Sequence, residues 1–508
     1  MSSTRNPTTS WLRTATALVA GSLITTLSAQ TGSYTIIDIG DLSPAGEVDS
    51  TNATGLNELG HVAAVTRDGS GPAVGTIAAL YRDGQLIDLG GLPGGAPGGG
   101  SKGVNNLGVV GGWGLHPWFT TGYQSEPFLW TEQGGMVNPF HGTSWEEWSG
   151  EIWDVNDAGQ AVFTGKGGFY DPVTGFKQVV FPGGLGIWKT WDLNEDGVVA
   201  GSARALTSQI NALRYDSATD TVVNLNHPVL DHHSDGYGIN DHGDVAGWAV
   251  ENGNLRPAML WTADGVTHRI YAGDLTPDHI DGTAEHVNNH GDIVGLDRVV
   301  FPTGGNPLYD PIGWVIFDFE AVGSHVKTPL KDLLSPTEAA QWHRLHPFEI
   351  NDRGEMAGIG VMQPGPPAAD FARGFLLVPN TPDRFRNLSR ALAGVDGHPV
   401  MTGRGTLDTG TAIDVNLYKA APNELAFLML GLDTIYAPLR GGVLVPDVAG
   451  PGGFSVLVVT DNAGRHAVNA TMPAGVPAGV DLVAQYWIVD DTAVQGASAS
   501  NAVIQQTK

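Results

Sequence analysis

A four-residue motif, Asn-x-x-Gly, occurs seven times along this chain and constrains its fold more than any other feature. In every copy an apolar residue precedes the asparagine, the second position is an acid or an amide, and a short apolar run follows the glycine. Successive copies lie about 49 residues apart on average. A period of this length is typical of a solenoid or of the blades of a propeller.

The motif has the chemistry of a tight hairpin turn. An asparagine at the first turn position can accept a hydrogen bond from the backbone two residues further on. A glycine in fourth place tolerates the left-handed conformation that closes a type I turn with a bulge. We therefore predict a turn between two short strands, rather than an active site, at each copy. The predicted turn residues are Asn57 and Gly60, Asn105 and Gly108, Asn156 and Gly159, Asn194 and Gly197, Asn240 and Gly243, Asn288 and Gly291, and Asn351 and Gly354.

A second strand–turn–strand module follows each motif, most clearly at residues 79–90, 127–138 and 258–270. Two hairpins per repeat form a four-stranded antiparallel unit, which is the size of a propeller blade. Trp130 and Trp261 lie on the predicted strands of this module, so we expect both rings in the core.

One strand is left without a partner at each end of the repeats. Residues 374–379 form a third strand that lacks a fourth, and residues 34–42 form a strand with nothing before it. Pairing these two strands removes exposed sheet edges, which would otherwise favour aggregation. We predict an all-β fold in which residues 34–380 form a seven-bladed β-propeller closed by its N-terminal strand. An open β-solenoid is the alternative.

The repeats resemble the HAF-type probable extracellular repeat of secreted bacterial proteins. Segments of the INxxGxVVG and FLW…G…DLG kind carry this resemblance over residues 34–379. The third repeat departs from it, because QAVFTG follows its turn and no FLW segment is present. The resemblance implies export and a β-repeat architecture, and it implies no reaction and no catalytic residues.

Charge, the N-terminal pattern and the absence of cysteine indicate where the protein is located and which classes of partner it does not bind. With 26 basic and 53 acidic residues, the net charge of -27 argues against binding to nucleic acid or anionic lipid. Residues 1–30 combine Arg5 and Arg13 with a short uncharged stretch and small residues, the pattern of a secretory signal peptide. A membrane anchor is the alternative, but the stretch is short and polar for a span. We expect a secreted or cell-surface protein, without disulfides because the chain has no cysteine.

The sequence pattern beyond the repeats predicts a separate β domain. Alternating apolar segments separated by Gly and Pro clusters favour an immunoglobulin-like β-sandwich over residues 397–508. Residues 381–396 read as a linker. Brief amphipathic patterns predict short helices at residues 383–392, within this linker, and at residues 337–345.

In the predicted meander, the long and varied connections share the face opposite the Asn-to-Gly turns. Binding residues concentrate on such loops. Tryptophan rings there are candidates for stacking on sugar rings, although large aromatics often pack against neighbouring blades instead. The candidates are Trp118, Trp145, Trp148, Trp188, Trp191 and Trp342.

Three connections rich in histidine and acids are candidate sites for a divalent cation, since imidazole and carboxylate bind such ions together. None has the HExxH spacing, so solvated loop residues are the alternative. The candidates are His227, Asp231, His232, His233, Asp235, Asp278, His279, Asp281, Glu285, His286, His343, His346 and Glu349. No other cofactor is indicated.

Residues 192–197 also spell the first half of a calcium-binding loop, DxNxDG. The twelfth position, where such a loop needs a bidentate acid, is Ala203. We therefore interpret this segment as the fourth copy of the repeat turn.

The sequence contains no GxSxG motif, and no catalytic triad is recognisable. Our leading hypothesis is a secreted, monomeric, non-enzymatic protein with a binding or structural role, whose ligand is a glycan or a cell-envelope component. The alternative is an extracellular propeller hydrolase or lyase that acts on polysaccharide.

Overall fold

The computed structural model describes residues 33–43, 50–67, 75–116, 124–143, 149–164, 167–181, 185–204, 210–225, 233–250, 256–270, 279–300, 309–319, 326–363 and 372–508. Strands dominate these ranges, so the all-β prediction is confirmed. None of the helices in the described part of the chain has the length and apolar character that crossing a membrane requires.

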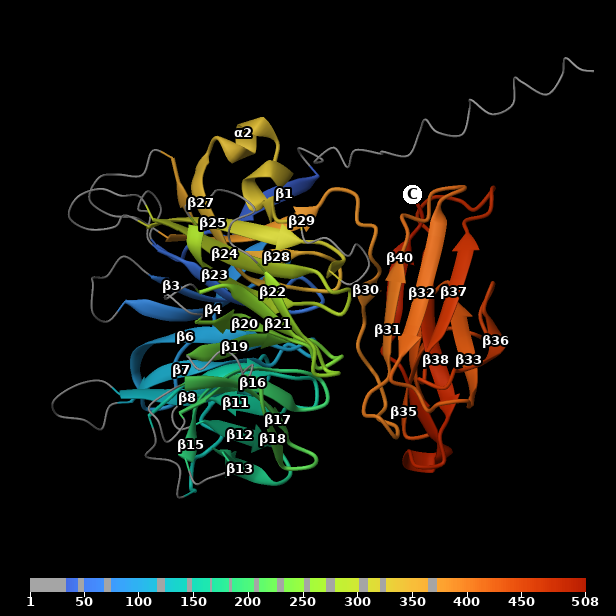
Figure 1. Ribbon diagram of the computed structural model, residues 1–508, viewed down its shortest axis with the longest axis horizontal. Helices are drawn as coiled ribbons and strands as arrows, with labels where there is room; N and C mark the ends of the chain where they lie inside the picture. The colour runs from blue at the N-terminus through green and yellow to red at the C-terminus, as the bar shows by residue number, and fades with distance from the viewer. Residues whose placement is uncertain are drawn as a thin grey trace, which may run out of the picture.

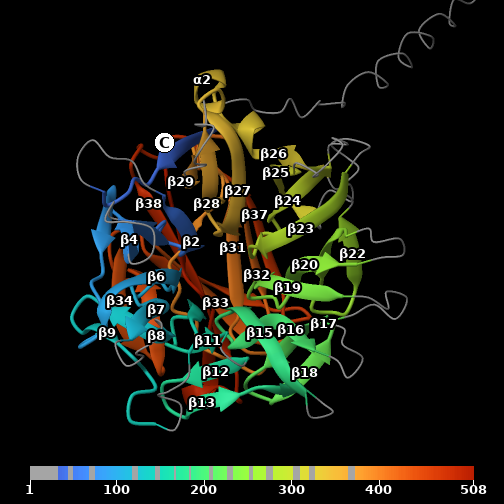
Figure 2. The same cartoon turned by 90° about the vertical axis from the view of Figure 1, so that its left-hand side faces the viewer.

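Residues 34–379 form seven antiparallel sheets that follow one another around a common centre (Figure 2). In each sheet the strand that ends at the turn asparagine lies nearest the centre, and the strands that follow it lie progressively outward. The fourth sheet has in addition a two-residue strand that pairs with the start of its innermost strand. The sheets are β2 (Asn52–Leu56), β3 (Val62–Arg67), β4 (Thr76–Arg82) and β5 (Gln85–Asp88); β6 (Ala96–Val104), β7 (Val110–His116), β8 (Gln124–Thr131) and β9 (Gly135–Val137); β10 (Ile152–Val155), β11 (Ala161–Phe163), β12 (Gly168–Asp171) and β13 (Gly175–Gln178); β14 (Val180–Phe181), β15 (Leu185–Leu193), β16 (Val198–Arg204), β17 (Ile210–Asp216) and β18 (Thr221–Asn224); β19 (Ser234–Ile239), β20 (Val245–Ala249), β21 (Ala258–Trp261) and β22 (Thr267–Ile270); β23 (His279–Val287), β24 (Ile293–Val300), β25 (Tyr309–Ile316) and β26 (Thr328–Pro329); and β27 (Trp342–Ile350), β28 (Met356–Met362), β29 (Ala372–Pro379) and β1 (Tyr34–Asp38).

The last of these sheets takes its outer strand from the other end of the repeat region. β1 pairs with β29 in an antiparallel register that runs from Tyr34 opposite Pro379 to Asp38 opposite Phe375. The Arg373 guanidinium also bonds to the Asp38 carboxylate, with two nitrogen–oxygen distances of 2.8 and 3.0 Å. The predicted pairing of these two strands is confirmed.

The hydrophobic cores lie between neighbouring sheets. One cluster, for example, joins Leu260 and Ile270 of the fifth sheet to Ile293 and Trp314 of the sixth. Trp130 and Trp261 are 9% and 2% exposed, which confirms that both rings are core residues. Each sheet therefore buries its faces against two neighbours, which explains the near-continuous apolar runs of the repeat.

Seven residues after the turn asparagine, five of the seven copies carry a glycine, as in the DVAG segment at Gly247, and this glycine allows a close backbone approach. A Cβ at Gly247 would lie 2.0 Å from the carbonyl oxygen of Asp235 on the neighbouring strand. The register of this strand pair shifts by one residue between Gly236 and Gly238. Such a bulge brings two residues of one strand against one of the other, and a side chain would not fit there.

All seven Asn-x-x-Gly segments form the predicted turns. Each glycine donates its N–H to the carbonyl oxygen of the asparagine three residues earlier and has a positive φ between 69° and 88°. Each asparagine Oδ1 also accepts the N–H of the residue four positions later.

The other half of each asparagine amide joins one sheet to the next. Each Nδ2 donates to the backbone carbonyl oxygen of the following turn asparagine, at 2.8 to 3.1 Å. The series runs Asn57, Asn105, Asn156, Asn194, Asn240, Asn288 and Asn351, and Asn351 donates to the carbonyl of Asn57. We call this closed series the asparagine ring.

A second series of hydrogen bonds runs beside it. The backbone N–H after each asparagine donates to the side chain of the residue at the same position in the next copy. This second-position ring consists of Glu58, Asn106, Asp157, Glu195, Asp241, Asn289 and Asp352. An acid or an amide stands at every second position because each must accept this hydrogen bond.

The remaining strands form two packed sheets and a hairpin beside the seven sheets (Figure 1). Met401, Val415, Leu428 and Tyr486 belong to the single core between the two sheets. The larger sheet contains β30 (Arg386–Asn387), β40 (Val503–Gln506), β38 (Asp481–Val489), β33 (Leu425–Gly431) and β36 (Phe454–Val459), with β39 (Ala497–Ala499) on β38; the smaller contains β31 (Val400–Arg404), β32 (Ala412–Tyr418) and β37 (His466–Thr471); the hairpin contains β34 (Thr434–Leu439) and β35 (Gly442–Pro446).

Both predicted helices are wrong over most of their length. The helix expected at residues 337–345 is limited to α2 (Pro336–Ala339), which follows η2 (Leu330–Leu333), because the chain enters β27 at Trp342. Residues 383–392 contain no helix, and Arg386 and Asn387 pair with β40. Ser389 and Arg390 have φ values of 60° and 71°, which end any helix, so tertiary pairing overrides the local pattern. A second 3-10 turn, η3 (Val494–Gly496), precedes β39.

The asparagine ring predicts the effect of a nearly isosteric substitution. Asn105→Asp keeps the Oδ1 that accepts the turn hydrogen bonds but replaces the Nδ2 donor with an oxygen that faces the carbonyl of Asn156. We expect a loss of about 1–3 kcal/mol in the free energy of unfolding, measured with urea, because a buried acceptor loses its donor. Asn469→Asp, at an exposed position on β37, should change stability by less than about 0.5 kcal/mol. Equal effects of the two substitutions would contradict a stabilising role for the Nδ2 bond.

Candidate functional site: the central cavity

The seven innermost strands surround a cavity of about 820 Å³. Residues of these strands, the turn asparagines and part of the C-terminal sheets line it. The cavity therefore extends from the centre of the seven sheets to the face that carries the Asn-to-Gly turns.

The C-terminal sheets bind this turn face through charged contacts. The Arg384 guanidinium, 8% exposed, forms an ion pair with Asp292, with Nε 2.8 Å from Oδ2. Asp196 in the fourth turn accepts a hydrogen bond from the backbone N–H of His398, at 2.6 Å, and pairs with the Lys419 ammonium. Although burial opposes the shift, these two partners lower the pKa of Asp196 to about 2. The Asp196 carboxylate thus holds the C-terminal sheets against the turns, and the calcium-loop alternative for residues 192–197 has no convergent ligands.

Four titratable side chains enter the cavity at one level, two residues before a turn asparagine. They are Asp154 on β10, Asp192 on β15, His286 on β23 and Glu349 on β27, and we call them the lumen cluster. The other three copies carry glycine at this position.

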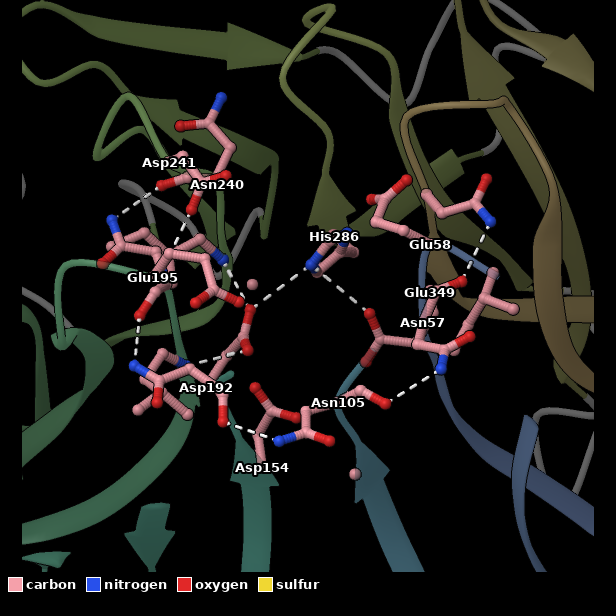
Figure 3. A pocket seen from close by; sticks show the side chains of 18 of the residues that line it. Asn57, Glu58, Asn105, Asp154, Asp192, Glu195, Asn240, Asp241, His286 and Glu349 are labelled. Atoms are coloured by element: carbon pink, nitrogen blue, oxygen red, sulfur yellow. Dashed lines mark hydrogen bonds and ion pairs between the residues drawn. The ribbon is translucent and has the colours of Figure 1, made fainter. Parts of the chain in front are cut away.

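His286 connects two carboxylates of the lumen cluster (Figure 3). Its Nε2 lies 3.4 Å from Asp192 Oδ2 and 3.3 Å from Glu349 Oε2. Asp192 is fixed from the other side, because its Oδ2 accepts the backbone N–H of Ile239 at 2.8 Å.

Burial and the contacts between its members shift the pKa values of the lumen cluster. Burial raises the pKa of Asp154 well above its usual range, and the nearby Asp192 carboxyl adds to this shift. Burial also raises the pKa of Glu349 to about 8, although His286 opposes the change. Against its own burial, the Glu349 and Asp192 carboxylates raise the pKa of His286 to about 9. Burial and these contacts therefore make the cluster retain protons above the pH range that is usual for its groups.

Aromatic side chains line the cavity one position earlier, three residues before a turn asparagine, on β10, β15, β19 and β27. Trp153, Trp191 and Tyr237 form an aromatic arc in which neighbouring ring centroids lie 4.5 and 5.6 Å apart in edge-to-face contact. Trp191 Nε1 donates to Asp235 Oδ1 at 3.0 Å, which fixes its ring. Phe348 also lines the cavity, next to the His346 ring.

Charged groups complete the wall near Phe348. His346 Nε2 lies 3.4 Å from Glu285 Oε1, and the Thr283 hydroxyl donates to the same oxygen at 2.6 Å. Despite opposing burial, these contacts lower the pKa of Glu285. The cavity thus offers hydrogen-bond donors and acceptors beside apolar ring surfaces.

Only part of the predicted sugar-binding set reaches this cavity. Trp191 lines it, from an inner strand rather than from a long connection. Trp342 is 2% exposed inside a hydrophobic core, where β27 packs against Phe375, so its proposed role in ligand binding is wrong. Trp118, Trp145 and Trp148 lie outside the described residues, and Trp188 belongs to β15 with an undescribed side chain.

The predicted metal ligands that the structure describes do not converge. Among the described residues, no group of three or more histidines and acids is arranged to hold a metal ion. His233 accepts the N–H of Ile210, Asp235 accepts from Trp191, His343 contacts Gln363, and His346 contacts Glu285. His227, Asp231, His232 and Asp278 lie outside the described residues, as do the side chains of His279 and Asp281.

The sequence-based predictions assign His286 and Glu349 to histidine-rich connections and Asp192 to a turn motif, omit Asp154, and do not bring the four residues together on the inner strands. The signal is nevertheless visible in the sequence. The residues before the turn asparagine read DV, DL, HV and EI in four copies and GL, GV and GI in the other three. A titratable group that replaces a recurrent glycine is the feature that marks these positions.

Comparisons with known proteins give no family. No family model matches the chain, and no curated protein matches it. Among solved structures, TolB from Acinetobacter baumannii is 12% identical with a TM-score of 0.32, and the match covers 62% of this chain and 63% of TolB. An exo-beta-1,3-galactanase from Phanerochaete chrysosporium is 11% identical with a TM-score of 0.28, over 92% of this chain and 100% of that one. Dipeptidyl peptidase 4 of Porphyromonas gingivalis is 9% identical with a TM-score of 0.29, over 80% and 71%. At these scores, none of the likenesses identifies an activity for this chain.

The buried Asp235 carboxyl predicts a pH-dependent stability. Burial raises its pKa to about 6, so the folded protein binds this proton more tightly than the unfolded chain between about pH 4 and pH 6. Stability therefore falls as the pH rises through this window. Asp235→Asn retains an oxygen that can accept from Trp191 and removes the ionisation. We expect its stability advantage over the wild type to grow from pH 4 to pH 7, reaching about 1–3 kcal/mol in urea unfolding.

Asp491→Asn, at an exposed position, is the matched control and should show no such trend. A stability difference for Asp235→Asn that is constant across this pH range would show that the buried carboxyl is not responsible.

Proposed function

We propose that this protein is a secreted, monomeric, seven-bladed β-propeller that binds a saccharide in its central cavity. The closed asparagine ring and the pairing of β1 with β29 support seven blades in one closed circle over residues 34–380. The common core of the C-terminal sheets supports an immunoglobulin-like sandwich over residues 397–508. The pattern of residues 1–30 and the resemblance to HAF-type repeats support export, to the medium or the cell surface.

The aromatic arc beside carboxyl groups is the observation that carries the proposed ligand class. Apolar ring faces and edges can pack against the C–H faces of a sugar, while carboxyl groups and imidazoles exchange hydrogen bonds with its hydroxyls. The volume of about 820 Å³ lies in the range of about 300–1,000 Å³ that is usual for small-molecule sites. A short oligosaccharide, or the end of a polysaccharide chain, matches this space.

In this proposal the C-terminal sandwich forms one end of the binding cavity. Its contacts with the turn face close one end of the cavity, and Arg390 and His398 belong to the cavity wall. A ligand then enters from the face opposite the turns. The cavity, rather than the connections alone, becomes the recognition site. Binding in this cavity does not depend on whether the bound saccharide is afterwards cleaved.

Calorimetric titration with cellohexaose, chitohexaose and hexagalacturonate tests the proposal. We expect the wild type to bind at least one of these probes. Trp153→Ala and Phe348→Ala should each weaken binding about tenfold or more, because the loss of one packing ring costs about 1–2 kcal/mol.

Phe454→Ala removes a ring that is 53% exposed on β36 and should leave the affinity unchanged. A wild type that binds none of the three probes, or cavity variants that bind like Phe454→Ala, would refute saccharide recognition by this cavity.

A further inference from the structure

We propose that the lumen cluster hydrolyses a glycosidic bond of the bound saccharide, with Glu349 as the proton donor and Asp192 as the base that activates water. This inference rests on the proposed function, since it requires a saccharide in the central cavity. It adds a reaction and assigns the residues that carry it out.

The four side chains of the lumen cluster stand at a position of the repeat where the other three copies carry glycine. Glycine at the corresponding position allows the innermost strands to approach each other closely. At Gly238, for example, a Cβ would lie 2.7 Å from the carbonyl oxygen of Glu285 and 2.7 Å from the Cα of His286. Four copies carry a titratable residue here instead, and all four side chains border the cavity. Departures from a local rule that gather in one cavity are expected at functional sites.

The two carboxyl groups lie at a suitable separation. Because His286 Nε2 is 3.4 Å from Asp192 Oδ2 and 3.3 Å from Glu349 Oε2, these oxygens cannot be more than about 7 Å apart. Carboxyl pairs in which one group activates water for direct attack are separated by about 6.5 to 9.5 Å, a range that the upper end of this limit reaches. Trp191 of the aromatic arc directly precedes Asp192 on β15, so a sugar packed on the arc lies next to this carboxyl group.

The environment of each carboxyl group matches its assigned task. The raised pKa of Glu349 keeps a proton on this carboxyl at neutral pH, as a general acid requires. The Asp192 Oδ2 accepts the Ile239 N–H at 2.8 Å and lies 3.4 Å from His286 Nε2, so this carboxyl group is held in a position to accept a proton from water. Asp154, whose pKa is raised by burial and by the nearby Asp192, is a positioning residue beside this carboxyl group.

The step balances with water as the only co-reactant. The Glu349 proton moves to the glycosidic oxygen while the bond from this oxygen to the anomeric carbon breaks. The oxygen of a water molecule forms a new bond to the anomeric carbon, and the proton that it loses moves to the Asp192 carboxylate. The products are a sugar with a new reducing end and a sugar with a free hydroxyl. Proton exchange with solvent then restores both carboxyl groups.

The test measures binding and cleavage of the same probes by the full-length protein. Release of reducing ends from cellohexaose, chitohexaose and hexagalacturonate is followed alongside calorimetric binding. We expect the wild type to cleave a probe that it binds. Asp192→Asn and Glu349→Gln should each lower the rate by about 100-fold or more, while their affinity changes by less than about tenfold. Glu132→Gln, at an exposed position on the outer side of the second sheet, should retain the wild-type rate.

The outcomes separate the two proposals. Binding without release of reducing ends overturns the hydrolysis and leaves the proposed function intact, whereas the absence of binding overturns both. Wild-type rates in Asp192→Asn or Glu349→Gln refute the assignment of that residue. Thermal melting by circular dichroism identifies a variant that does not fold. If one of the two variants does not fold, the cleavage rate of the other decides whether the lumen cluster carries out the hydrolysis.

Discussion

The fold depends on a hydrogen bond that a turn asparagine makes to the next turn. Its Oδ1 shapes its own hairpin, while its Nδ2 donates to the backbone of the neighbouring sheet. Seven such bonds lead from Asn57 back to Asn57, and the second-position ring repeats the circuit with backbone donors and side-chain acceptors. One amide thus satisfies buried polar groups in two sheets. Because the chain has no cysteine, no disulfide can join the sheets in place of these hydrogen bonds. The repeat keeps Asn because no other side chain supplies both functions at this length.

This circuit also positions the candidate site. Since the innermost strand of every sheet ends at a ring asparagine, the residues two and three positions earlier lie at fixed heights around the cavity. Glycine at the first height lets the strands approach, and the lumen cluster replaces it in four sheets. The aromatic arc occupies the second height on three consecutive inner strands, β10, β15 and β19. The C-terminal sheets close the turn face by placing cations such as Arg384 against turn acids such as Asp292, in a protein whose net charge is -27.

Much of the architecture was predictable from local chemistry. The turns follow from Asn and Gly at fixed spacing, and the pairing of β1 with β29 follows from counting strands that lack partners. The Nδ2 bonds were not predictable in the same way, because they join residues about 50 positions apart and depend on how the sheets pack. The helix expected at residues 383–392 failed for a similar reason, since β40 captures Arg386 and Asn387. For the site, the general preference for loops led to the opposite face, and Trp342 proved to be a core residue.

Closure of the circle is the claim on which the cavity and both functional proposals depend, and a disulfide across β1 and β29 tests it most directly. Thr35 and Val378 are directly opposite each other in this antiparallel pair, where Cβ atoms are about 4.5–5.5 Å apart. The account predicts that Thr35→Cys with Val378→Cys, in a chain without other cysteines, forms an intramolecular disulfide on oxidation, seen by non-reducing mass spectrometry. Two cysteines that remain free thiols, or that link only separate molecules, would contradict the closed circle.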